Sequence, residues 1–237
     1  MIEISDLSVD FRTEAGRKQI IEKIDLSVGD GQSLAIIGPN GCGKTTLLHA
    51  IAGLKEDYSG RVHISEPRSK VAFILQDIGL LPWKTIWKNA TLGLDLNRIQ
   101  DETKTTELLE RLDLMKYKND YPSQLSGGER RKLGLVRALA IDPKILLMDE
   151  PLVSLDEFTR EKLQNNILEL WQEDQLTMML VTHDIEEASF LGEKIAVLTP
   201  APSSVKEIID NQTMGEIDFR RSENFYQVAH SLRQSLP

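Results

Sequence analysis

The sequence has a single cysteine, Cys42, among its 237 residues. One cysteine excludes an internal disulfide framework and fits a reducing compartment. The sequence contains no apolar run that approaches the roughly 20 residues that a membrane-spanning helix needs. The N-terminal segment MIEISDLSVD also lacks the basic region followed by an apolar one that marks a secretion signal. We therefore expect a cytoplasmic protein.

Basic residues are not in excess. The 28 Lys and Arg residues are outnumbered by 37 Asp and Glu residues, which gives a formal net charge of -9. Non-specific nucleic-acid binding usually depends on an excess of basic residues, so we expect no nucleic-acid partner. Hydrophobic residues make up 41% of the chain, which is enough for a packed core and excludes a disordered protein.

The spacing of apolar residues predicts an α/β protein. Residues 2–28 alternate between apolar and polar positions, which is typical of antiparallel strands, and TEAGRK at 13–18 is the expected turn. From residue 33, short apolar runs alternate with helical stretches, which indicates a parallel sheet covered by helices. The expected strands are SLAII, KILLM, MMLVT and IAVL. Residues 77–125 break this alternation and predict a mostly helical insert.

A final amphipathic helix is expected near the C-terminus, although the pattern weakens after Pro200. Its apolar positions are Phe225, Val228, Ala229 and Leu232, which recur at helical spacing.

The segment GPNGCGKT at 38–45 follows the run SLAII and precedes an expected helix. It matches the pattern G-x-x-x-x-G-K-[S/T], in which backbone N–H groups and a helix N-terminus surround phosphates. Lys44 would reach the β- and γ-phosphates, and the Thr45 hydroxyl would hold Mg²⁺. The alternative is a chance turn, which the flanking strand and helix disfavour. The expected nucleotide-binding residues are Gly38, Pro39, Asn40, Gly41, Cys42, Gly43, Lys44, Thr45 and Thr46.

Two adjacent carboxylates, Asp149 and Glu150, follow the apolar run ILLM. Acids at the end of a buried strand need a partner, which a metal ion with phosphate would supply. Asp149 is the candidate Mg²⁺ ligand, directly or through water, and Glu150 would orient or deprotonate the attacking water. An acidic cap or a salt bridge is the alternative.

His183 ends the next expected strand, MMLVTH. It would lie at the same carboxyl edge of the sheet, where open α/β folds bind their ligands. There its imidazole would hydrogen-bond a γ-phosphate, although a lone histidine is more often structural.

The segment LSGGE at 125–129 precedes the helical pattern RRKLGLVRALA. Ser126 and Glu129 have the S-x-x-E spacing of a capping box, which explains them but not Gly127 and Gly128. Bare glycine backbone at a helix N-terminus is also a site that phosphate can approach closely. The sequence therefore predicts a second phosphate-binding segment, far along the chain from the first.

With these motifs in this order, the chain resembles the ATP-binding subunit of an ABC transporter over about residues 1–200. The matching parts are GPNGCGKT, Gln76, LSGGE, ILLMDE, the SLD that ends at Asp156, and His183. The resemblance implies a P-loop NTPase (RecA-like) core with an N-terminal antiparallel β subdomain and a helical subdomain inserted at about 77–135. It also implies an ATPase that uses ATP and Mg²⁺. The C-terminal tail at 201–237 is too short for an ordinary separate regulatory domain.

In that family two copies pack head to tail, and the signature of one copy clamps the ATP bound to the P-loop of the other. The signature residues here are Leu125, Ser126, Gly127, Gly128 and Glu129. The resemblance also assigns Gln76 to Mg²⁺ and the attacking water, and Asp156 to the dimer interface. Phe11 matches the aromatic that stacks on adenine, and the alternative is a core phenylalanine. ATP binding would close the dimer and hydrolysis would reopen it, which moves attached membrane subunits.

The segment after Gln76 indicates which transporters are most similar. It fits Q-x(4)-LLPW-x-T-x(3)-N and resembles the importer subfamily for nitrate, sulfonates, taurine and bicarbonate, which includes carriers of thiamine-precursor pyrimidines. In relatives this segment forms part of the groove that receives the coupling helix of the membrane subunit. The alternative is a plain apolar turn at Leu81, Pro82 and Trp83.

We therefore expect the ATP-binding subunit of a binding-protein-dependent importer for a small anionic solute such as nitrate, sulfonate or taurine. Its partners would be a second copy, two transmembrane permease subunits and, indirectly, an extracytoplasmic solute-binding protein. The chain would lie at the cytoplasmic face of the membrane. Another small solute, or a soluble ABC ATPase outside transport, is the alternative, although no long heptad arm or second cassette is visible.

Several features depart from the subfamily pattern. They are GEKIA at 192–196, ERRK after the signature glycines, the segment 200–237, and a short loop expected at 54–70. They concern the solute and leave the ATPase motifs intact. Separately, Cys42 in the P-loop is expected to react with maleimide, with protection by ATP.

Overall fold

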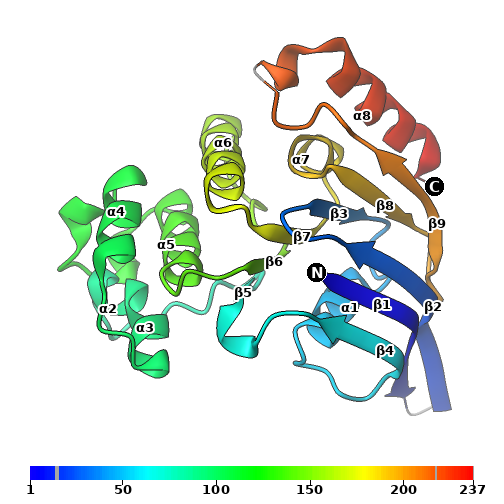
Figure 1. The fold of residues 1–237 in the computed structure, drawn as a ribbon, viewed down its shortest axis with the longest axis horizontal. Helices are drawn as coiled ribbons and strands as arrows, with labels where there is room; N and C mark the ends of the chain where they lie inside the picture. The colour runs from blue at the N-terminus through cyan, green and yellow to red at the C-terminus, as the bar shows by residue number, and fades with distance from the viewer. Residues whose placement is uncertain (14–15, 217, 237) are drawn as a thin grey trace.

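The computed structural model describes residues 1–13, 16–216 and 218–236 (Figure 1). Its strands form a three-stranded sheet of order β2-β1-β4 and a six-stranded sheet of order β5-β6-β7-β3-β8-β9. The bounds of the first sheet are β1 (Ile2–Thr13), β2 (Gly16–Val28) and β4 (Ser59–Ile64). Those of the second are β3 (Ser33–Ile37), β5 (Val71–Ile74), β6 (Ile145–Asp149), β7 (Thr177–Thr182), β8 (Lys194–Leu198) and β9 (Val205–Asp210).

The N-terminal sheet is antiparallel, as the alternation of residues 2–28 predicted. Its apolar positions, such as Ile2, Ile4 and Leu7, are buried. Residues 14 and 15 of the predicted turn lie outside the described residues. β4 falls within the segment that was expected to be a loop, and it pairs with β1.

The six-stranded sheet is parallel except for β9, which runs antiparallel to β8. All residues of β3, β6 and β7 are buried, as their short apolar runs predicted. Alternate residues serve two different cores: Leu34 and Ile36 pack with the antiparallel sheet and α1, whereas Ala35 and Ile37 pack on the opposite face. The sheet is therefore the middle layer of the molecule.

Helices cover both faces of this sheet. Figure 1 shows α1 (Lys44–Ile51) with the antiparallel sheet on one side, and α6 (Glu157–Asp174), α7 (Ile185–Leu191) and α8 (Glu223–Ser235) on the other. The apolar residues predicted for the last helix are the buried residues of α8, which packs on α7. A 3₁₀ turn, η4 (Phe219–Arg221), precedes α8.

A helical lobe lies to the left of the sheet in Figure 1 and follows the edge strand β5. It contains α2 (Ile86–Ala90), α3 (Leu92–Asn97), α4 (Thr103–Arg111) and α5 (Gly127–Leu139). The short turns are η1 (Arg68–Lys70), before β5, and η2 (Met115–Tyr117) and η3 (Pro122–Gln124) within the lobe. The central helix, α5, packs against α2, α3, α4 and β5. Among the described residues, no helix is long and apolar enough to cross a membrane.

The parallel register places the predicted motifs at one edge of the sheet. Ile37, which precedes the P-loop, pairs with Thr182, and Asp149 pairs with Val181. The ends of β3, β6 and β7 therefore lie side by side, as expected for a ligand site in an open α/β fold.

Candidate active site

The P-loop connects β3 to α1. Gly43 has φ +103, and an added Cβ would come within 2.8 Å of Ile20, so only glycine fits there without strain. Lys44 is buried, and its ammonium donates hydrogen bonds to the carbonyls of Gly38 at 2.8 Å and Pro39 at 3.1 Å. A phosphate that entered the loop would offer this ammonium charged oxygens, which are stronger acceptors than carbonyls.

Thr45 and Asp149 form the neighbouring polar pair. The Thr45 hydroxyl donates to an Asp149 carboxylate oxygen at 3.1 Å, and Asp149 is buried. Burial raises the pKa of Asp149, and the hydrogen bond from Thr45 opposes that rise. A hydroxyl beside a desolvated carboxylate fits Mg²⁺, which prefers oxygen ligands and completes its shell with water and substrate phosphates.

The protein alone offers few ligands for such an ion. In the part of the chain that the structure describes, no group of three or more His, Cys, Asp or Glu side chains is placed to hold a metal. One hydroxyl and one carboxylate match the usual binding of Mg²⁺, in which one or two protein carboxylates act together with substrate phosphates and water.

Glu150 and His183 meet at the ends of β6 and β7. His183 Nδ1 lies 3.3 Å from Glu150 Oε1. Glu150 adopts a left-handed backbone conformation with φ 44, and its N–H donates to the carbonyl of Val181 at 2.9 Å. This conformation is uncommon for a residue other than glycine and is often found at functional sites.

A pocket of about 290 Å³ lies between the P-loop and Glu150. Its lining residues are Phe11, Ile20, Asn40, Gly41, Gly43, Lys44, Thr45, Thr46 and Glu150. Phe11 is 42% exposed and so is not a core residue. The ammonium of Lys55 lies 4.6 Å from the centroid of its ring. Sequence reasoning did not single out Ile20, because its position on β2 gives no sign that it faces the P-loop.

Cys42 is 1% exposed, and burial raises the pKa of its thiol. Because the thiolate is the nucleophile, a buried neutral thiol reacts slowly. The expectation of ready maleimide labelling is therefore not supported by the structure. Position within the P-loop did not reveal that this side chain points into the core.

The LSGGE segment forms the start of α5, and the predicted capping box is present. The Ser126 hydroxyl accepts from the Glu129 N–H at 3.2 Å, and the Glu129 carboxylate accepts from the Ser126 N–H at 2.8 Å. Leu125 is buried beneath this turn.

The two glycines of this segment have different surroundings. An added Cβ on Gly128 would come within 2.7 Å of the Thr159 methyl group, whereas one on Gly127 would meet nothing within 4 Å. Packing therefore explains Gly128 and leaves Gly127 unexplained. Figure 1 shows α5 in the helical lobe and α1 beneath the sheet, so one chain does not bring its signature to its own P-loop.

Gln76 and Asp156 lie outside the pocket. Gln76 is exposed just after β5, and its carbonyl accepts from Arg131 at 2.9 Å. Asp156 is exposed and caps α6 by accepting from the Thr159 N–H at 3.0 Å, which lowers the pKa of its carboxyl group.

A buried acid, Glu187, lies beside His183 and was missed by sequence reasoning. It helps to line a small hollow of about 80 Å³ that also includes Glu150, His183 and Arg160. One carboxylate oxygen accepts from the Thr182 hydroxyl, while the other has no hydrogen-bond partner among the described residues. Burial raises the pKa of Glu187 to about 7. Its position directly after Glu186 in the sequence gave no sign of this burial.

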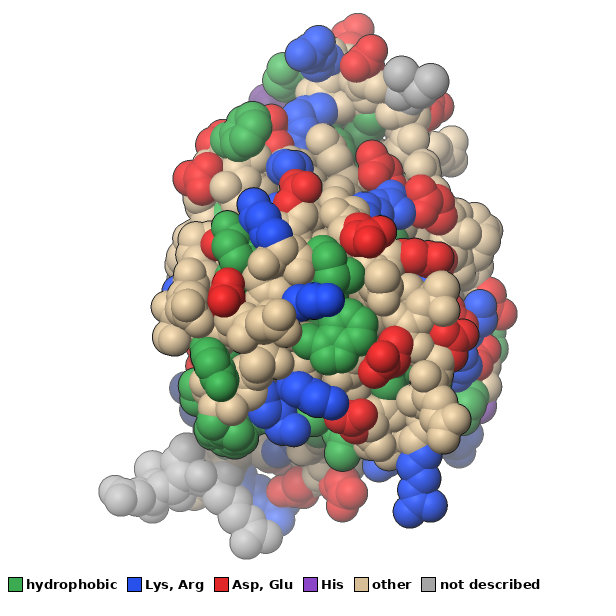
Figure 2. All heavy atoms as spheres, turned by 90° about the vertical axis from the view of Figure 1, so that its left-hand side faces the viewer, with side chains coloured by type: hydrophobic (Ala, Val, Ile, Leu, Met, Phe, Trp, Pro, Cys, Tyr) green, Lys and Arg blue, Asp and Glu red, His purple; other side chains and the backbone are tan. Residues whose placement is uncertain are grey.

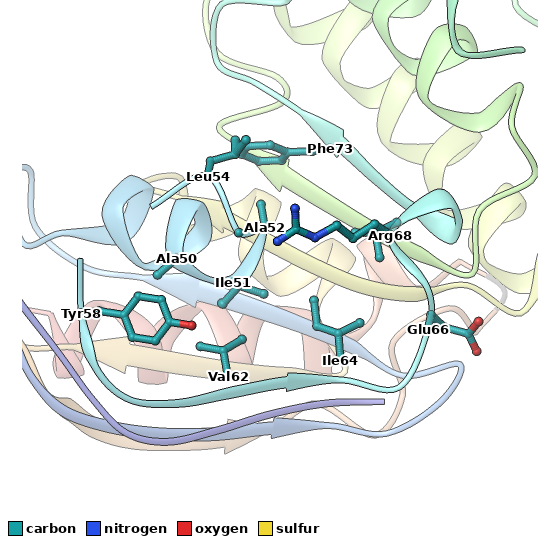
Figure 3. Close-up of a pocket in the computed structure, with 12 residues that line it drawn as sticks. Ala50, Ile51, Ala52, Leu54, Tyr58, Val62, Ile64, Glu66, Arg68 and Phe73 are labelled. Atoms are coloured by element: carbon teal, nitrogen blue, oxygen red, sulfur yellow. The ribbon is translucent and has the colours of Figure 1, made fainter. Parts of the chain in front are cut away.

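A separate pocket of about 340 Å³ lies between the end of α1, β4 and β5 (Figure 3). Figure 3 shows Ile51, Val62 and Ile64 on its apolar wall, with the Arg68 side chain extending toward Ala52. None of the predicted site residues line it. We therefore assign it no part in the chemistry.

A P-loop at the edge of a parallel sheet, a hydroxyl–carboxylate pair and a Glu–His pair together define a P-loop nucleotide-binding protein. Residues 21–153 match the family model described as ABC transporter, which is more than half of the chain. The chain belongs to this family. It is an ATP-binding chain of the ABC class and an ATPase.

Curated relatives cover most of the chain. It is 36% identical over 228 residues to an aliphatic sulfonates import ATP-binding protein, SsuB, of Bacillus cereus, covering 94% of this chain and 89% of the relative. It is 39% identical over 215 residues to the taurine import ATP-binding protein TauB of Escherichia coli O157:H7, covering 87% and 83%.

Solved structures confirm the fold class. The dimeric structure of MJ0796, a bacterial ABC transporter cassette, superimposes with a TM-score of 0.81 at 28% identity, covering 89% of this chain and 99% of the cassette. A second similar structure is the same cassette in a post-hydrolysis state bound to ADP and Pi, with the same TM-score of 0.81.

Proposed function

We propose that this chain hydrolyses ATP for a binding-protein-dependent importer of a small anionic solute, such as a sulfonate, taurine or nitrate. Glu150 lines the same pocket as the P-loop and lies 3.3 Å from His183, and this arrangement is the observation that carries the ATPase part. The import of aliphatic sulfonates and of taurine by SsuB and TauB supports the solute class. This proposal puts the chain at the cytoplasmic face of the membrane.

The pocket residues divide the reaction between them. The P-loop backbone and Lys44 bind the phosphates, while Thr45 and Asp149 hold Mg²⁺. When bound there, the metal ion would supply positive charge beside the phosphates. Glu150 orients the attacking water or accepts its proton. His183 contacts the γ-phosphate, and its contact with Glu150 fixes its ring near that position.

Four further predicted residues complete this assignment. Phe11 stacks on the adenine, because its ring is exposed on the wall of the same pocket. Gln76 approaches Mg²⁺ and the attacking water when the site closes. Asp156 lies at the dimer interface, which its exposure allows. Asn40 lies on the pocket wall with the P-loop.

A second copy of the chain supplies the missing side of the site. Ser126 and Gly127 are exposed at the start of α5, away from the P-loop of their own chain. No side chain occupies the space beside Gly127, so a phosphate can approach its backbone. In a head-to-tail dimer, the signature of each copy lies against the P-loop of the other, so both ATP sites are completed together.

The turn before α2 is the candidate contact for a membrane subunit. Asn89 is buried, and its side chain accepts from the N–H of Leu81 at 2.8 Å and donates to the carbonyls of Leu81, Lys84 and Thr85 at 3.0–3.1 Å. These bonds fix the LLPWKT turn, which presents Trp83 with 71% of its surface exposed. Figure 2 shows apolar side chains among charged ones on this face of the helical lobe.

The exposed apolar residues of the lobe are Trp83, Leu96, Ile99 and Tyr121. Such a surface suits two permease subunits, which would connect the chain indirectly to an extracytoplasmic solute-binding protein.

The test is the solution mass of Glu150→Gln with and without Mg-ATP. Loss of the carboxylate blocks hydrolysis and retains bound ATP, so we expect an ATP-dependent dimer. The same variant with Ser126→Arg should stay monomeric, because a bulky cation then occupies the phosphate-binding turn. A dimer that forms equally well with Ser126→Arg would contradict the head-to-tail arrangement.

A further inference from the structure

Two arginines of α5 hold the segment that follows β5. Arg131 Nη1 donates to the carbonyl of Gln76 at 2.9 Å. Two turns along the helix, Arg137 Nη1 donates to the carbonyl of Gly79 at 2.9 Å, and its Nη2 donates to that of Ile78. The helix that begins with the signature is thus bonded to three backbone carbonyls of residues 76–79.

A close packing contact lies between these two arginines. Gly134 is buried on α5, and an added Cβ there would come within 2.5 Å of Ile78 Cγ2. The helix and the segment 76–79 therefore approach more closely than any side chain at position 134 would allow. Contact on one side of α5 is continuous over residues 131–137.

Apart from this contact, little in the structure explains why the two arginines are partly buried. Burial lowers the pKa of both Arg131 and Arg137, and no described carboxylate offsets that effect for Arg137. A desolvated cation needs hydrogen-bond acceptors, and the loop carbonyls supply them. Arg131 also lies within electrostatic reach of Asp77, Glu187 and Glu150, which links it to the catalytic edge.

We propose that Arg131 and Arg137 clamp residues 76–79 to α5, so that movement of the signature repositions Gln76. The inference rests on the proposed head-to-tail dimer. There, Ser126 and Gly127 at the start of α5 touch the partner's ATP, while Gln76 serves the chain's own ATP. The clamp therefore transmits occupancy of one ATP site to the other through a single helix.

The test compares Arg131→Met and Arg131→Met/Arg137→Met with the unaltered chain in ATP titrations of hydrolysis by the full chain. Coupled sites give a sigmoidal dependence on ATP, and we expect the double variant to be hyperbolic. We also expect its kcat to fall about tenfold with the half-saturating ATP concentration nearly unchanged, because ATP binding does not use the clamp. Arg131→Lys keeps a charged donor and should restore most of the cooperativity.

Arg111→Met is the matched control. Arg111 lies on α4 of the same lobe and donates to Glu169 of α6 at 2.8 Å, rather than to residues 76–79. The Arg111→Met variant should lower thermal stability at least as much as Arg131→Met does, while hydrolysis keeps its sigmoidal dependence on ATP concentration. Amide hydrogen exchange of residues 75–80 should rise in the clamp variants and stay normal in this control.

Two results would overturn the clamp: a double variant with unchanged cooperativity and kcat, or a hyperbolic dependence in the unaltered chain. In either case Ser126→Arg separates this inference from the proposed function. If that variant abolishes hydrolysis, the dimer stands and the clamp fails. If it has no effect, the head-to-tail dimer itself is wrong.

Discussion

Glu187 is a buried acid among several charged groups at the end of β7. Asp184 and Glu150 raise the pKa of its carboxyl group, Arg160 lowers it, and burial has the largest effect. The Thr182 hydroxyl that bonds to Glu187 also accepts from the N–H of Asp184 at 3.0 Å, so these groups together hold the turn that carries His183.

We expect Glu187→Gln to change the pH dependence of stability. The folded pKa of about 7 exceeds the ordinary value of 4.5, so the folded state binds a proton more tightly than the unfolded state. Stability is therefore lost as pH rises from the lower value through the higher one. The glutamine variant should match the unaltered chain near pH 5 and exceed it by up to about 3 kcal/mol near pH 8.

Urea unfolding at both pH values measures this difference. Glu186→Gln, an exposed neighbour on the same helix, is the control and should show no such divergence. Parallel stability curves for Glu187→Gln and the unaltered chain would mean that Glu187 is ionised in the folded state.

At the residue scale, motifs predicted the polar groups that lie together at one edge of the sheet. Lys44, Asp149 and His183 could be found because their chemistry requires a particular side chain at a fixed place after a strand. Arg131 could not, because its partner is a backbone carbonyl, which any residue supplies. Glu187 was missed because the sequence does not distinguish the buried acid from the exposed Glu186 beside it.

At the start of α5, we expect Gly128 to serve packing and Gly127 to serve the approach of phosphate. Gly128→Ala should destabilise the fold by about 1–3 kcal/mol, because its methyl group would overlap Thr159 of α6. Gly127→Ala should leave stability unchanged or slightly higher, because its methyl group meets no neighbour and alanine favours helix. We nevertheless expect Gly127→Ala to weaken ATP-dependent dimerisation in the Glu150→Gln background.

Thermal unfolding and solution mass separate these two effects. Normal dimerisation by Gly127→Ala would show that phosphate does not need bare backbone at that position. Equal destabilisation by both substitutions would contradict the packing difference between the two glycines.

Elements with a buried, continuous apolar run could be predicted from the sequence, and β3, β6 and β7 are of this kind. β4 and β9 were missed because each is largely exposed, so their pairing with β1 and β8 leaves no apolar run. β5 is also a continuous apolar run, VAFI, but it was missed because it has only four residues. α5 was predicted from its apolar spacing and continues to Leu139.

At the scale of the whole molecule, the P-loop edge of the six-stranded sheet and the exposed LLPWKT turn lie on different elements. The turn that carries Trp83 is fixed by hydrogen bonds from the Asn89 side chain, and the indole itself is exposed. Removing the indole should therefore not disturb the fold. We expect Trp83→Ala to retain ATP-dependent dimerisation while losing co-purification with the permease and at least about tenfold of transport-coupled hydrolysis.

Leu96→Ala is the control for this substitution. Its side chain is 76% exposed on α3 of the same lobe, so it tests whether any loss of exposed apolar surface has the same effect. Normal permease binding by Trp83→Ala would mean that the membrane subunits dock elsewhere.

The buried thiol of Cys42 has a practical consequence for measuring the proposed opening and closing of the dimer. Because the chain's one native cysteine is hidden in the core, a cysteine introduced on the surface would be the main site for a thiol-reactive dye or spin label. Exposed positions such as Glu110 in the helical lobe and Arg61 on β4 are available for this purpose. Distances between the labels on two copies would then report opening and closing of the dimer. Cys42 would not need to be replaced, so the P-loop would keep its natural sequence.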